Sequence, residues 1–254
     1  MSDLNAEQLA VVHSYAKLIC CVAGPGSGKT HTMCARISKQ IADGADPKSF
    51  LIITYTNAAA DEIQKRIGTQ YRFGYIGTLH AFLFRLLSLR GNNIGLPSSL
   101  SIIDEDAKEG IIESIIEELG VKASVKNVLP LLKNADLITM PTYARAKSFT
   151  KPQLCAIEYH ARLRRSGLLD FDTILFYGER LINKIVEKVA TEVWPYDYIY
   201  WDEGQDGSDE DFRILEAAPC EFKFIIGDPD QSIYGFRGAK PENISKLCLQ
   251  EIEF

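Results

Sequence analysis

Hydrophobic and polar positions follow two alternating periods over the first ninety residues. Short apolar runs at 18–22, 50–54 and 75–76 are typical of buried strands, and amphipathic stretches between them predict helices over 5–14, 29–43, 57–67 and 78–89. Asn5 with Gln8 resembles a capping box, Gly44 is expected to stop the second helix, and Asn57 to cap the third. Strands that alternate with helices predict an α/β fold with a parallel sheet covered by helices.

The pattern changes in the middle of the chain. Residues 104–119 have helical periodicity with an acidic polar face, and 125–135 and 151–166 are also expected to be helical. Strand signals nearly vanish there, so the sequence predicts a mostly helical inserted subdomain over 91–167.

The strand pattern then resumes. Asp170 is expected to cap a helix that runs to about 189, strands are predicted over 196–201 and 222–226, and Pro241 is expected to begin a terminal helix. The main domain would therefore comprise 1–90 and 168–254.

Composition and charge exclude several classes of protein. The chain has 254 residues, of which 46% are hydrophobic and 24% charged, as in ordinary globular proteins. No apolar run approaches the roughly 20 residues that span a bilayer, and no signal peptide is evident, so we expect a cytoplasmic protein without a membrane partner.

The six cysteines lack zinc-type spacing and are expected to be reduced thiols. A net charge of −6 means that any DNA binding must come from a local groove.

A glycine-rich segment lies between the first predicted strand and its helix. It reads Ala23-Gly24-Pro25-Gly26-Ser27-Gly28-Lys29-Thr30 and ends in the Gly-Lys-Thr of the phosphate-loop consensus. Its backbone amides and the helix N-terminus suit phosphate oxygens. Lys29 would reach the β- and γ-phosphates, and Thr30 would ligate Mg²⁺.

Two acids end another predicted strand. Asp202 is placed to hold Mg²⁺ and Glu203 to orient and deprotonate a water. Such a pair alone would usually be a solvated turn. A second polar loop at 227–231 follows another strand, however, so both loops are expected at one sheet edge, where Gln231 could sense the terminal phosphate.

These motifs and several others occur in a characteristic order. The chain resembles the N-terminal half of the superfamily 1 DNA helicases of the UvrD, Rep and PcrA type, in segments 4–8, 23–30, 54–60, 77–82, 169–172, 202–206 and 227–239. The resemblance implies a RecA-like P-loop motor domain that uses ATP and Mg²⁺. It also implies single-stranded DNA and single-strand/duplex junctions as partners, together with a second RecA-like domain in cis or in trans.

The resemblance assigns roles to individual residues. Glu203, Lys29 and Gln231 would be catalytic, and Thr30 and Asp202 would hold the metal. The ATP-binding set would be Gln8, Gly24, Gly26, Ser27, Gly28, Lys29, Thr30, Arg36 and Gln205, in which Gln8 reads the adenine and Gln205 links the γ-phosphate to DNA contacts. The single-strand groove would be lined by Tyr55, Thr56, Asn57, Thr78, His80, Tyr234, Phe236 and Arg237.

Three departures from the family pattern affect these expectations. Gly204 stands where relatives have a bulky residue, so looser packing beneath Glu203 is expected, and Phe236 replaces a usual Trp. The family's later motifs, which supply arginines from a second domain, are not in this chain, so low ATP turnover by the chain alone is expected. Two alternatives remain: a nucleotide- or DNA-binding regulatory module without motor activity, and an unrelated P-loop kinase.

Overall fold

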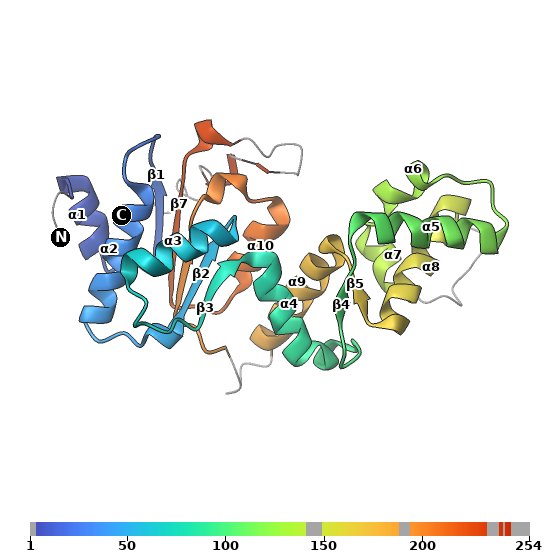
Figure 1. The fold of residues 1–254 in the computed structure, drawn as a ribbon, viewed down its shortest axis with the longest axis horizontal. Helices are drawn as coiled ribbons and strands as arrows, with labels where there is room; N and C mark the ends of the chain where they lie inside the picture. Colours follow the sequence, from blue (N-terminus) through green and yellow to red (C-terminus); the bar gives the residue numbers. More distant parts are fainter. Residues whose placement is uncertain (1–3, 141–148, 188–193, 233–238, 241, 245–254) are drawn as a thin grey trace. The chain divides into compact units, whose positions relative to one another are not determined.

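The computed structural model describes residues 4–140, 149–187, 194–232, 239–240 and 242–244, which Figure 1 traces from the N-terminus. The chain divides into two compact units. One comprises Met1–Phe82 with Ile182–Phe254, and the other comprises Leu83–Leu181. The insertion proposed over 91–167 falls within the second unit.

A five-stranded sheet forms the centre of the first unit. Its strand order is β1-β7-β6-β2-β3, and every neighbouring pair is parallel, which confirms the predicted parallel α/β sheet. The strands are short and largely apolar, as expected for a sheet buried on both faces. Their bounds are β1 (Leu18–Val22), β2 (Phe50–Thr54), β3 (Tyr75–Thr78), β6 (Tyr198–Trp201) and β7 (Phe222–Gly227).

Local capping fixes the helices of this unit. The capping box of Asn5 and Gln8 begins α1 as predicted. The third helix is capped by the Thr56 hydroxyl, which accepts from the Ala59 amide, so the prediction that Asn57 is the cap is wrong by one residue. The helices are α1 (Ala6–His13), α2 (Lys29–Ala42), α3 (Asn57–Ile67), the first turn of α4 (Leu79–Arg90) and α10 (Asp209–Ala217), with single 3₁₀ turns at Pro47–Ser49, Gly204–Asp206 and Pro229–Gln231.

Helices cover both faces of the sheet (Figure 1). Ile37 of α2 and Ile63 of α3 share one buried cluster with Phe224 of β7. Tyr200 of β6 belongs to the same cluster. Because successive side chains of a strand point to opposite faces, its neighbour Trp201 faces the other side of the sheet, where its ring lies 4.5 Å from the Phe212 ring of α10. The sheet is therefore packed against helices on both faces, and the loops emerge at the ends of its strands.

The second unit is mainly helical around its own core. Its longest continuous helix within the unit, α8 (Lys151–Ser166), has the bounds that were predicted. A capping box of Thr150 with Gln153 begins this helix, and Gly167 follows its last residue. The single helix predicted over 125–135 is wrong, because Pro130 interrupts it. The remaining elements are α5 (Glu105–Leu119), α6 (Val125–Val128), α7 (Ala135–Thr139), most of α9 (Phe171–Glu187), 3₁₀ turns at Gly91–Ile94 and Leu129–Leu131, and a parallel pair β4 (Ser101–Ile102) and β5 (Leu168–Leu169).

Several smaller expectations have mixed outcomes. Cys21, Cys34, Cys155 and Cys220 are free thiols, but Cys20 is disulfide-bonded, so the expectation of reduced cysteines is wrong there. Residues 242–244 are helical, whereas Pro241 lies outside the described residues. Within the described part of the chain, no helix is both long and apolar enough to cross a bilayer.

Candidate functional site

The parallel sheet brings the predicted chemical groups together at one edge, the edge formed by the carboxyl ends of its strands. All five strands point the same way, so the loops that follow them emerge together. The phosphate loop follows β1, Asp228 follows β7, and Asp202 follows β6, and these three strands are neighbours. The expectation that the two acidic loops share an edge is therefore confirmed.

The phosphate loop is a tight turn between β1 and α2. Gly26 (φ 72°) and Gly28 (φ 79°) adopt left-handed backbone angles, which glycine tolerates best. The Ser27 hydroxyl donates to the Gly24 carbonyl over 2.7 Å and holds the turn closed. Gly28 gives α2 no side-chain cap, so the first-turn amides of this helix are left for another acceptor.

Lys29 turns its ammonium group inward at this edge. Its Nζ donates to the Ala23 carbonyl over 3.2 Å and lies 3.8 Å from the Asp228 carboxylate. The Lys29 and Asp228 side chains are only 10% and 4% exposed. The ammonium thus lies directly beside the phosphate loop.

Thr30 and Asp202 form a pair of oxygen donors. The Thr30 hydroxyl donates to Asp202 Oδ2 over 3.2 Å. Burial, with a smaller contribution from the charge of Glu203, raises the pKa of Asp202 to about 6. No group of three acidic, histidine or cysteine ligands occurs among the described residues. Two oxygen ligands suit Mg²⁺, which usually takes its remaining ligands from water and phosphate.

Glu203 has an unusual backbone conformation. Its φ of 55° is the only positive φ among the described non-glycine residues, and such a conformation costs about 1–2 kcal/mol. Its carboxylate accepts from the Gln205 amide over 2.8 Å, and Gln205 in turn accepts from the Asp228 main-chain amide over 2.8 Å. Gln205 therefore bridges the loops after β6 and β7.

Asp228 is a site residue that sequence reasoning missed. Gln231, predicted to sense phosphate, donates its side-chain amide to Asp228 Oδ2, and Asp228 also accepts from the Asp230 amide over 3.1 Å. The available signal was its position, because Asp228 directly follows β7 as Asp202 directly follows β6.

Gln8 lies beside the phosphate loop although it belongs to α1. Its side-chain amide donates to the Ser27 carbonyl over 2.8 Å, while its carbonyl oxygen accepts from the Asn5 amide in the capping box. The predicted contact with adenine stays a prediction, and the observed contact fixes α1 against the loop.

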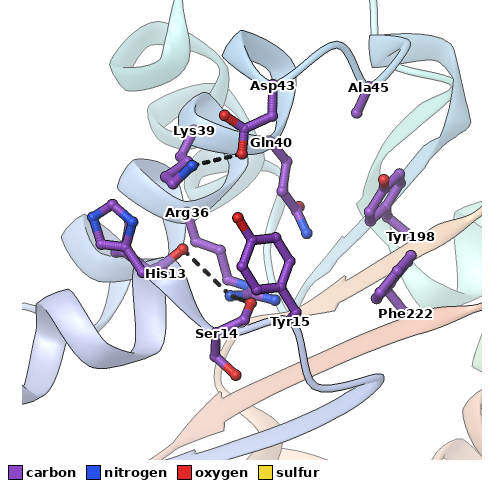
Figure 2. Close-up of a pocket in the computed structure, with 11 residues that line it drawn as sticks. His13, Ser14, Tyr15, Arg36, Lys39, Gln40, Asp43, Ala45, Tyr198 and Phe222 are labelled. Atoms are coloured by element: carbon purple, nitrogen blue, oxygen red, sulfur yellow. Dashed lines mark hydrogen bonds and ion pairs between the residues drawn. The ribbon is translucent and has the colours of Figure 1, made fainter.

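Arg36 lies in the middle of α2, away from the phosphate loop. It lies seven residues beyond Lys29, or about two helical turns. Its Nη1 donates to the carbonyls of Val11 over 2.6 Å and Ser14 over 2.8 Å, and Figure 2 shows it beside a pocket that Tyr15 and Lys39 also line. Arg36 thus caps the C-terminal end of α1, and its predicted contact with nucleotide stays a prediction.

The packing around Gly204 differs from expectation. A Cβ atom built at this buried position would lie 2.7 Å from Ile225 Cγ2 and 3.3 Å from Ile244 Cδ1. The two isoleucines already fill the space that a larger residue would need. The expected looseness beneath Glu203 is therefore not observed.

Five of the eight predicted DNA-contacting residues lie at the ends of the other two strands or just after them. Tyr55, Thr56 and Asn57 come directly after β2. Thr78 is the last residue of β3, and His80 lies in the first turn of α4. Thr54, at the end of β2, pairs with Thr78 in the sheet. Thr56 and Asn57 are exposed, and the other three are half-buried. The segment after β2 and the start of α4, which follows β3 directly, are therefore adjacent. Tyr234, Phe236 and Arg237 lie outside the described residues.

The motif at 169–172 belongs to the second unit and has a structural role there. Asp170 caps α9 by accepting from the Thr173 amide over 2.7 Å and also accepts from the Tyr159 hydroxyl over 2.7 Å. Lys108 lies 3.8 Å from the same carboxylate. Burial alone would raise the pKa of Asp170, but the hydrogen bonds from Thr173 and Tyr159 outweigh it and hold the pKa below its usual value.

Comparison with known proteins identifies relatives over almost the whole chain. Residues 4–250 match the family described as UvrD/REP helicase N-terminal domain. The chain is 31% identical to the ATP-dependent DNA helicase PcrA of Leuconostoc citreum, over 96% of this chain and 35% of that protein. It is 32% identical to a probable DNA helicase II homolog of Mycoplasma capricolum over 93% and 36%, and 27% identical to PcrA of Staphylococcus aureus over 96% and 36%. The chain thus spans about a third of the length of these relatives.

Proposed function

Because the chain belongs to the UvrD/REP helicase N-terminal domain family, we propose that it is the ATP-binding motor domain of a DNA helicase or translocase. Its RecA-like α/β fold and its helicase class follow from that membership. The binding of Mg-ATP, the contact with single-stranded DNA and the hydrolysis of ATP by this chain are the parts that we propose. One observation carries the proposal: Lys29, Thr30, Asp202 and Glu203 lie together after two strands that are both neighbours of β7.

The phosphate loop fits a nucleoside triphosphate. Uncapped amides at the start of α2 suit phosphate oxygens, and Lys29 adds a positive charge beside them. Thr30 and Asp202 offer the two oxygen ligands that Mg²⁺ needs from the protein. When bound, the ion would neutralise charge on the phosphates.

Glu203 is proposed to hold the attacking water and accept its proton. The Gln205 amide donates to one oxygen of the Glu203 carboxylate and so orients it. The other carboxylate oxygen is then proposed to accept a hydrogen bond from the water. The strained backbone at Glu203 is of the kind that clusters at functional sites. Gln231 is proposed to contact the terminal phosphate.

The segment after β2, the end of β3 and the first turn of α4 are proposed to form part of a single-strand groove. Tyr55 offers an aromatic face on which any base can stack, at about 1–3 kcal/mol per base. Thr56, Asn57, Thr78 and His80 add polar groups for the backbone of the strand. Few of these residues are charged, which agrees with a chain whose net charge is −6.

A second RecA-like domain is proposed to complete the motor by adding cations to the phosphate site. The chain covers about a third of its relatives, and their activity as helicases is stated for the whole proteins. A regulatory module that binds nucleotide or DNA without turnover is the alternative. The intact set of Lys29, Thr30, Asp202 and Glu203 favours the motor.

ATP hydrolysis stimulated by single-stranded DNA distinguishes these functions. We expect Glu203→Gln to abolish stimulated hydrolysis in the complete protein while Mg-ATP affinity stays within about threefold, because the amide retains the shape of the side chain but accepts no proton. Glu210→Gln, on the outer helix α10, is the matched control and should hydrolyse ATP normally. Unchanged hydrolysis in Glu203→Gln would contradict the proposed base. Nucleotide binding with no stimulated hydrolysis in the unsubstituted protein would favour the binding module.

A further inference from the structure

Asp228 holds the two side chains that a phosphate would need. Its carboxylate lies 3.8 Å from Lys29 Nζ and accepts from the Gln231 side-chain amide on the same oxygen, Oδ2. Both contacts are formed at the edge of the sheet beside the phosphate loop. The carboxylate is thus an anion placed where it engages both a cation and an amide donor.

The contact between Lys29 and Asp228 is weak enough for a phosphate group to replace the carboxylate. Lys29 and Asp228 are largely buried, so solvent and salt screen their attraction little. At 3.8 Å the pair is nevertheless longer than a direct charge-assisted hydrogen bond, which is about 2.7–2.9 Å. A phosphate group has more charge and more acceptor oxygens than one carboxylate, so it can displace Asp228 from Lys29.

Asp228 is also connected to the catalytic side of the site. Its main-chain amide donates to Gln205 over 2.8 Å, and the Gln205 amide donates to Glu203 over 2.8 Å. A shift of the Asp228 main chain would therefore act directly on the Gln205 side chain. The same amide group then orients Glu203 differently.

We propose that Asp228 is an internal competitor for phosphate, so that nucleotide binding transfers Lys29 and Gln231 from its carboxylate to the nucleotide. The released Asp228 moves with the end of β7 and passes that movement through Gln205 to Glu203. Asp228 acts as a positioning residue in this scheme. The inference rests on the proposed nucleotide site and adds an element of regulation to it.

The test measures the affinity of the whole chain for ADP without Mg²⁺, so that the metal ligands are not engaged. Asp228→Asn preserves the shape of the side chain and the oxygen that accepts from the Asp230 amide, but removes the charge that holds Lys29. We expect ADP to bind about fivefold more tightly, or more, since removing the carboxylate charge frees the Lys29 ammonium for the phosphate. Mere damage to the fold would weaken binding, and thermal unfolding followed through Trp201 checks that the variant is folded.

Two matched variants separate competition from simple charge removal. Asp230→Asn changes an exposed acid two residues away and should leave ADP affinity within about twofold. Asp202→Asn removes an equally buried charge at the same edge that is bonded to Thr30, and should increase affinity less than Asp228→Asn does.

Each outcome decides the proposal. Tighter binding in Asp228→Asn that exceeds the change in both controls supports it. Unchanged or weaker binding, or an equal gain in Asp202→Asn, overturns it while leaving the proposed nucleotide site intact. Failure of the unsubstituted chain to bind ADP would overturn the proposed function and this inference together.

Discussion

At the scale of single residues, the packing beneath Glu203 depends on a glycine at position 204. Gly204 leaves room for Ile225 and Ile244, whose methyl groups occupy the space beneath Glu203. Its identity as glycine is therefore a packing requirement. The sequence alone could show that a larger residue was missing there, but not that isoleucines from 20 or more positions downstream fill the gap.

Adding one methyl group at this position should destabilise the first unit. Gly204→Ala would bring a Cβ atom within 2.7 Å of Ile225, and such overpacking typically costs about 1–3 kcal/mol. Thermal unfolding followed by Trp fluorescence should show a lower midpoint. Gly110→Ala is the control, because the added Cβ atom would meet nothing within 4 Å. Alanine favours an exposed helix over glycine, so the unfolding midpoint of this variant, followed by circular dichroism, should not fall. A midpoint for Gly204→Ala at or above the original would contradict this packing account.

Tyr55 provides a residue-scale test of the proposed groove. Tyr55→Ala should lower affinity for single-stranded DNA by about tenfold or more, because a stacked base contributes about 1–3 kcal/mol. The loss should be similar for different homopolymers, measured by fluorescence anisotropy. Tyr15→Ala is the control, because Tyr15 is 82% exposed between α1 and β1, away from the loops after β2 and β3. Equal losses in both variants would mean that Tyr55 has no specific role.

At the scale of elements, capping signals determine how well helices can be predicted. α8 has both Thr150 with Gln153 at its start and Gly167 after its end, and its predicted bounds are confirmed. The stretch after Ser124 lacks a side-chain cap hydrogen bond and contains Pro130, so amphipathic periodicity there concealed a break. β4 and β5 have two residues each, which is too short for any period to be visible.

His160 makes the second unit sensitive to acid. The side chain is 1% exposed on α8, and burial lowers its pKa from 6.5 to about 4, although the nearby charge of Asp170 partly opposes this. The unfolded chain therefore binds a proton between these pH values that the folded chain does not. Stability is full above pH 6.5 and falls by about 3 kcal/mol as the pH drops toward 4.

Replacing this histidine should flatten the acid side of the profile. His160→Gln cannot titrate, so its stability should decrease less between pH 6.5 and 4 than that of the original chain, whatever its level at pH 7. Hydrogen exchange of α8 amides, compared between the two proteins at each pH, cancels the intrinsic pH dependence of exchange. Parallel profiles for the two proteins would show that His160 does not carry the effect.

At the scale of the whole molecule, strand order distributes the proposed functions along one edge. The phosphate loop, Asp228 and Asp202 follow β1, β7 and β6, and the proposed DNA residues follow β2 and β3. β6 joins the two groups, since it pairs with β7 on one side and β2 on the other. A parallel sheet and a shared edge could be predicted from buried runs that alternate with helices. The order could not, because the five strands are all short and largely apolar, and only their packing determines which are neighbours.

The affinity of Lys29→Ala for Mg-ATP tests the central claim, a phosphate-binding motor domain, most directly. Lys39→Ala is the matched control on the same helix, since Lys39 pairs with Asp43 over 2.6 Å at the end remote from the loop. We predict a loss of about tenfold or more for Lys29→Ala, as for a charge-assisted contact, and no more than about a twofold change for Lys39→Ala. Mg-ATP affinity that is unchanged in Lys29→Ala, or reduced equally in both variants, would contradict the account.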